Sequence, residues 1–173
     1  MGNYDIIIFA EFFRGTYFKK RGEDTNMQMY ERIPGCNGCG ACVLGCNRRF
    51  CIKMVRDENG RWLPRIDENS CDRCNNCYLY CPLYNPVKLP SFSQYYEYDD
   101  EYYDRDMPPI YRAVLRQSKQ GQVTDFAGTL CQIAGLKSVM GDKLRPNVRI
   151  YPIHCDPDHP RRPECVECPF IER

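Results

Sequence analysis

Two cysteine runs of identical spacing are the residues of this chain best suited to chemistry. Both follow the pattern Cys-x2-Cys-x2-Cys-x3-Cys, the first over residues 36–46 and the second over residues 71–81. Four thiolates directed at one centre hold a cubane [4Fe-4S] cluster, and cysteines this closely spaced come from a loop wrapped around it. Zinc sites usually combine Cys-x2-Cys pairs separated by a longer span. The spacing therefore predicts iron–sulfur clusters, with zinc and disulfides as the alternatives.

The last cysteine of each run is expected to cross to the cluster of the other run, as in two-cluster ferredoxins. Cluster 1 then has the ligands Cys36, Cys39, Cys42 and Cys81. Cluster 2 has the ligands Cys71, Cys74, Cys77 and Cys46. Glycines at positions 35, 38 and 40 let the backbone approach the inorganic sulfurs.

Residues 31–86, which include both runs, resemble bacterial-type two-cluster ferredoxins. Between the runs we expect a β-hairpin with strands at residues 52–55 and 62–66, because the turn at residues 57–60 ends in Asn-Gly, a strong hairpin signal. Cys51 lies outside both runs, and we expect it to be a small buried residue and not a ligand.

Four more cysteines lie in the second half of the chain: Cys131, Cys155, Cys165 and Cys168. Four thiolates suffice for one further site, and we expect a third [4Fe-4S] cluster there, with zinc or separately buried thiols as alternatives. His154 or His159 could replace one ligand. A redox-active pair at residues 165 and 168 would usually lie near a βαβ pattern, and the tail around it shows none.

A second resemblance covers the same region. Residues 128–137, Gly-Thr-Leu-Cys-Gln-Ile-Ala-Gly-Leu-Lys, resemble a segment of the deazaflavin-coenzyme hydrogenase and dehydrogenase beta-subunit family. Residues 150–155 and 162–168 resemble that family's later strand and Cys pair, and the family also carries an N-terminal two-cluster module. Leu130 replaces the family's Pro, and its flavin-binding body has no counterpart between residues 116 and 122. The resemblance implies a cluster site among the C-terminal cysteines.

Around these sites the sequence predicts an α+β protein. It would consist of a ferredoxin-like two-cluster module with an N-terminal arm and a small C-terminal cluster-binding extension. The expected divisions are an arm at 1–30, the module at 31–86, a Tyr- and acid-rich linker at 87–109 and the cysteine-containing extension at 110–173.

Two helices and one strand are expected in the extension. Apolar spacing predicts helices over residues 110–119 and 130–140, the second ending at Gly141. A strand is expected over residues 148–153. The tyrosines of the linker suit either a strap that docks on a partner or a loop wrapped over the chain's own core.

Composition excludes several classes of protein. With 24 basic and 23 acidic residues the formal net charge is +1, which argues against a nucleic-acid binder. No apolar run approaches the ~18 residues of a membrane span, and no secretory signal is found. We therefore expect a cytoplasmic protein, where disulfides are rare, and an odd total of 13 cysteines agrees with metal binding.

No catalytic triad, phosphate-binding loop or dinucleotide fingerprint is found in the sequence. We expect an electron-transfer subunit, not itself an enzyme, of a multi-subunit anaerobic oxidoreductase. Its partners would be a separate catalytic subunit and a ferredoxin-like donor or acceptor. By analogy it is similar to the small iron–sulfur subunits of tungsten-pterin enzymes such as the benzoyl-CoA reductases. The alternatives are a truncated deazaflavin-dependent oxidoreductase with bound flavin, a free-standing ferredoxin and a zinc-stabilised interaction module.

Overall fold

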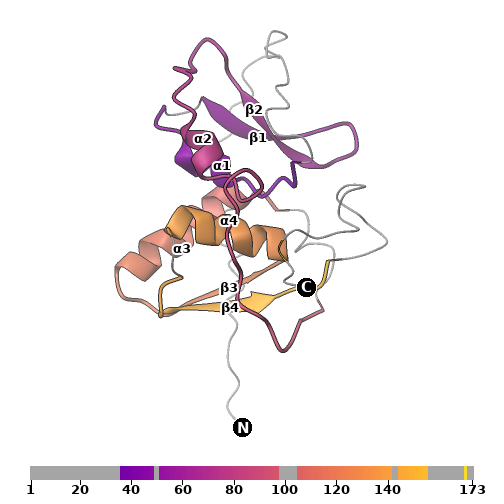
Figure 1. Ribbon diagram of the computed structural model, residues 1–173, viewed down its shortest axis with the longest axis vertical. Coiled ribbons are helices and arrows are strands. Elements are labelled where there is room, and N and C mark those ends of the chain that lie inside the picture. Colours follow the sequence, from indigo (N-terminus) through magenta and orange to yellow (C-terminus); the bar gives the residue numbers. More distant parts are fainter. Residues whose placement is uncertain (1–35, 49–50, 98–104, 142–143, 156–169, 171–173) are drawn as a thin grey trace, which may run out of the picture.

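The computed structural model describes residues 36–48, 51–97, 105–141, 144–155 and 170 of the chain (Figure 1). The expected N-terminal arm, His159, Cys165 and Cys168 lie outside the described residues. The described part is a mixed α and β structure, as the sequence predicts, with the element order α1-β1-β2-α2-α3-β3-α4-β4. We call the first four elements the N-terminal unit and the last four the C-terminal unit.

The N-terminal unit contains the expected hairpin. Strand β1 (Ile52–Arg56) pairs antiparallel with β2 (Trp62–Ile66). The carboxylate of Asp57 closes the turn by accepting hydrogen bonds from the backbone N–H groups of Asn59 at 2.9 Å and Arg61 at 2.8 Å. Helices α1 (Ala41–Gly45) and α2 (Asn76–Leu79) flank the hairpin in sequence and pack against each other.

The C-terminal unit is built on a βαβ motif. The sequence did not predict this motif, and it was wrong to count its absence against a redox-active pair at residues 165 and 168. Strands β3 (Thr124–Gly128) and β4 (Val148–Pro152) are parallel, and helix α4 (Leu130–Met140) connects them. Helix α3 (Met107–Lys119) precedes the motif. Helices α3 and α4 both lie between the β3–β4 sheet and the N-terminal unit (Figure 1). The sequence did not predict β3, because a parallel strand is usually a continuous apolar run and Thr-Asp-Phe-Ala-Gly is not one.

The other expected elements are found with small changes at their ends. Helix α3 begins three residues earlier than predicted, with Pro108 and Pro109 in its first turn, where a missing N–H costs nothing. Helix α4 has the predicted bounds. Its N-terminus is closed by a capping box in which the Thr129 N–H donates to the Gln132 side chain at 2.9 Å. Strand β4 ends one residue before the predicted position.

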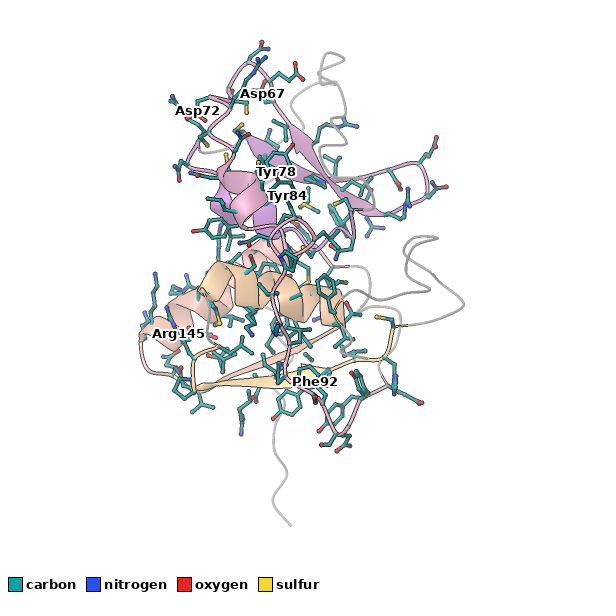
Figure 2. The ribbon with its side chains drawn as sticks, viewed as in Figure 1. Asp67, Asp72, Tyr78, Tyr84, Phe92 and Arg145 are labelled. Carbon is teal, nitrogen blue, oxygen red and sulfur yellow. The ribbon has the colours of Figure 1, made fainter. Side chains whose placement is uncertain are left out.

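The described part of the linker, residues 87–97, packs on the protein itself. Leu89 is buried in the core of the C-terminal unit, and Tyr95 packs against that core. Phe92 packs there as well (Figure 2). Tyr96 pairs with Ile153 beyond β4, and its N–H donates to the carbonyl of Pro152 at 2.9 Å. For these residues the structure favours the wrapped loop over the docking strap.

One apolar core joins the two units. Tyr111, Ile133 and Leu136 are fully buried in it, and Cys39 and Ala41 of the N-terminal unit belong to the same cluster. The Ser138 hydroxyl of α4 donates to the Tyr80 carbonyl across the boundary at 2.8 Å. The first cysteine run is therefore part of the main core.

Candidate iron–sulfur site

The two cysteine loops share one backbone conformation. Two residues after its first cysteine, each loop has a left-handed residue, Gly38 with φ 67° and Arg73 with φ 55°. Four residues after the first cysteine the same occurs again, at Gly40 with φ 74° and Asn75 with φ 62°. Left-handed backbone is uncommon outside glycine, so its presence at matching positions in both loops marks a repeated structure.

The same side-chain hydrogen bond also recurs in both loops. In the first, the Asn37 side-chain oxygen accepts from the Cys39 N–H at 3.2 Å. In the second, the Asp72 carboxylate accepts from the Cys74 N–H at 3.3 Å. Asn and Asp occupy the same position of the two runs, a signal that was present in the sequence and was not used. These Asx turns fix each loop between its first two cysteines.

Each loop leads into one of the short helices. The third cysteine of each run, Cys42 or Cys77, is the second residue of α1 or α2. The two helices meet at equivalent positions, since a Cβ atom on Gly45 would lie 2.5 Å from Tyr80 Cδ2. This close approach brings the end of each run toward the other run.

The cysteines assigned to cluster 1 lie near one another. Burial raises the pKa of Cys42 well above its ordinary value, and negative charge on Cys36, Cys81 and Cys77 would raise it further. Burial likewise raises the pKa of Cys39. A backbone hydrogen bond at Ala41 lowers it in part, and negative charge on Cys42 and Cys36 would raise it further. Cys81, which belongs to the second run, is thus within electrostatic range of the first loop.

Cys46, the last cysteine of the first run, lies close to the second run. Burial raises the pKa of Cys51 to about 12, with charge and hydrogen-bond contributions from Cys46 and then Cys71. Cys46 and Cys71 pack against one small core that contains Cys51 and Cys77. The last cysteine of the first run therefore lies beside the first cysteine of the second. Cys51 is buried, as the sequence predicts, but its proximity to both runs was not expected.

The surroundings of the two loops differ sharply. Residues 37–40 of the first loop are buried; a Cβ atom on Gly40 would lie 2.7 Å from Pro108 of α3, and one on Gly135 of α4 would lie 3.3 Å from Cys39 Cβ. Residues 72–75 of the second loop are all exposed, Cys74 included. Asp67 and Asp72 lie at the end of the molecule farthest from the C-terminal unit (Figure 2).

The grouping of the donors in the two loops bears on which metal centre they could hold. Among the described residues no three His, Cys, Asp or Glu side chains are grouped closely enough to hold one metal ion, and no cysteine forms a disulfide. The buried amide nitrogen of Asn37 has no hydrogen-bond partner among the described residues, and cluster sulfur beside the loop would supply an acceptor.

Of the four cysteines expected to form a third site, the structure describes Cys131 and Cys155, which differ in burial. Cys131 is buried at the second residue of α4, where its sulfur is 3.1 Å from the Thr129 hydroxyl and within electrostatic range of Cys39. Cys155 is exposed three residues beyond β4, at the same end of the parallel strands. Phe170, two residues after Cys168, packs in the core that contains Cys131. The ring of His154 stacks on Tyr95, with ring centroids 4.9 Å apart.

The Asx turn of the second loop gives a first testable expectation. The thiol and N–H of Cys74, together with Arg48, hold the pKa of Asp72 below its ordinary value. Asp72→Asn keeps the oxygen that accepts from Cys74 and matches Asn37 of the first loop, whereas Asp72→Ala removes it. We expect Asp72→Ala to lose iron to a chelator several-fold faster than the wild type and Asp72→Asn to behave like the wild type. Equal rates in all three proteins would contradict a role for this turn.

Comparisons of the chain with protein-family models, with curated proteins and with solved structures found no match. In the part of the chain that the structure describes, none of the helices has the length and apolar character needed to span a bilayer. The function is therefore inferred from the two loops and their surroundings.

Proposed function

We propose that this chain is an electron-transfer subunit that binds two [4Fe-4S] clusters on its crossed cysteine sets. Cys36, Cys39, Cys42 and Cys81 would hold cluster 1, and Cys71, Cys74, Cys77 and Cys46 would hold cluster 2. The observation that carries the proposal is the repeated loop conformation, supported by the proximity of Cys81 to Cys42 of the first loop and of Cys46 to the core that contains Cys77. The resemblance of residues 31–86 to two-cluster ferredoxins supports the same assignment.

The protein's own contribution is to hold the sulfur ligands in a fixed geometry. A bound cluster supplies one-electron chemistry, and transfer is fastest when its surroundings move little. Asx turns at Asn37 and Asp72 and left-handed residues in both loops hold the backbone in one shape. The close contact of Gly45 with Tyr80 fixes the two runs relative to each other.

Because the two cysteine loops differ in burial, the two clusters would occupy different positions in an electron-transfer path. The second loop is exposed and would exchange electrons with an external protein such as a ferredoxin. The first loop is covered by α3 and α4 and borders Cys131, so it would relay electrons toward the C-terminal unit. A third cluster on Cys131, Cys155, Cys165 and Cys168 would extend this path, with zinc as the alternative occupant.

The catalytic step would occur on a separate subunit. No catalytic constellation was found in the sequence, and the proposed partner is the substrate-binding subunit of an anaerobic cytoplasmic oxidoreductase. A tungsten-pterin enzyme of the benzoyl-CoA reductase type is the analogy that the sequence suggests. Metal analysis of the complex isolated with this chain tests that analogy directly.

The decisive experiment is metal and sulfide analysis of the full chain purified without oxygen. We expect a brown protein with about 8 Fe per chain, or about 12 Fe if the third site also holds a cubane. About 8 Fe plus one zinc would reject the third cluster and keep the first two. A colourless protein without iron would overturn the proposal. Flavin retained after cluster removal would favour the oxidoreductase alternative.

A further inference from the structure

Cys51 is the one cysteine outside every expected ligand set, and it is held firmly in place. It is only 2 % exposed and directly precedes β1. Its carbonyl accepts from the Asp67 N–H at 2.8 Å, and its own N–H donates to the Arg48 carbonyl at 3.3 Å. The backbone of Cys51 therefore joins the segment after the first run to the segment before the second.

The side chain of Cys51 lies between the two runs. Cys46 and Cys71, one cysteine from each run, pack against the core that contains Cys51, and both add to the effect of burial in raising its pKa. Ile52, Ile66 and Cys77 complete this small core. Cys46 and Cys71 both belong to the ligand set of cluster 2, so the thiol of Cys51 borders that cluster most closely, while Cys42 of cluster 1 packs against the same core.

The thiol has one proton to donate and several acceptors near it. The Asp67 carbonyl is 3.7 Å from the sulfur, a long contact even for a thiol donor. Cluster-bound thiolates carry negative charge and are better acceptors than a neutral carbonyl. A hydrogen bond to a ligand sulfur stabilises the reduced cluster, which has one more negative charge, and such bonds are among the factors that set cluster potentials.

We propose that Cys51 donates an S–H hydrogen bond to the sulfur ligands of cluster 2 and thereby raises its reduction potential relative to that of cluster 1. The inference rests on the proposed function, because it requires cluster 2 to be present. Cys51 is thus a positioning and tuning residue and not a fifth ligand. Its effect would hold electrons on the exposed cluster, where an external partner exchanges them.

The test is a redox titration of the full chain, followed by electron paramagnetic resonance, in the wild type and three variants. Cys51→Ala and Cys51→Val remove the donor, and Val also fills the space. Cys51→Ser keeps a donor of similar size. A separate Cys74→Ser variant alters a ligand of cluster 2 and so identifies its signal.

We expect the midpoint potential of cluster 2 to fall in the Ala and Val variants while that of cluster 1 stays unchanged. The Ser variant should recover most of the wild-type value. One exchangeable-proton coupling on cluster 2 should also disappear in the Ala and Val variants.

Three results would overturn the proposal: unchanged potentials, an equal shift of both clusters, or a loss of about four irons in Cys51→Ala, which would make Cys51 a ligand. A wild-type chain without clusters would instead reject the proposed function itself.

Discussion

Cys39→Ser should remove cluster 1 and also destabilise the whole described fold, whereas Cys74→Ser should remove cluster 2 alone. Both residues are the second cysteine of their run, so the substitutions are matched in position. Cys39 lies in the core shared with α3 and α4, while Cys74 is exposed. Each variant should lose about four irons. The Cys39 variant should also lose about 1–3 kcal/mol more unfolding free energy than the Cys74 variant, because its new hydroxyl is buried whereas that of the Cys74 variant is exposed.

Iron analysis and thermal unfolding under anaerobic conditions would measure both effects. Cys51→Ser, which exchanges a buried sulfur for oxygen outside the proposed ligand sets, controls for the chemical change itself and should keep all of its iron. Equal loss of stability in the Cys39 and Cys74 variants would contradict the unequal burial of the two loops as the cause.

Gly40→Ala should be strongly damaging for a change of one methyl group. Gly40 has φ 74°, and an added Cβ would lie 2.7 Å from Pro108 Cδ, in a ring that cannot rotate away. A left-handed alanine costs about 1–2 kcal/mol. Overpacking at a tight contact adds about 1–3 kcal/mol. Because Gly40 lies between Cys39 and Cys42, the displaced loop should also hold cluster 1 less tightly.

Gly60→Ala provides the matched control for this change. Gly60 has nearly the same backbone, with φ 77°, but nothing lies within 4 Å of an added Cβ. Its substitution should cost only the conformational part, about 1–2 kcal/mol, with no loss of iron. Denaturant unfolding of the two variants gives the contribution of the Pro108 contact by difference. Equal costs would show that the contact between the first loop and α3 is unimportant.

Local signals in the sequence predicted the elements that depend on local chemistry. The Asn-Gly turn located the hairpin, and Gly141 located the end of α4, where its φ is 93°. Strand β3 was missed because its pairing with β4 depends on contacts formed across helix α4, which no short pattern records. For the same reason the aromatic residues of the linker gave two equal interpretations until the pairing of Tyr96 with Ile153 was seen.

Of the candidate site, the sequence likewise predicted the local parts and missed the contacts between distant segments. Regular cysteine spacing was enough to propose two ligand sets, because each loop is a local structure. The neighbours of those sets come from distant parts of the chain. Cys131 lies near Cys39 only because α4 packs on the first loop, and Cys51 meets Cys71 only because the hairpin closes. Spacing alone could not distinguish a lone buried thiol from one that borders a cluster.

The covering of the first loop by α3 and α4 would also impose an order on the insertion of the two proposed clusters. Once the C-terminal unit has docked, a scaffold protein that delivers iron and sulfide has no approach to residues 37–40, which are buried beneath it. In the proposed function, cluster 1 would therefore be inserted before the C-terminal unit packs on the first loop, whereas the exposed second loop would stay accessible for repair. Damage by oxygen at the two centres would then have unequal consequences, reversible at one and requiring partial unfolding at the other.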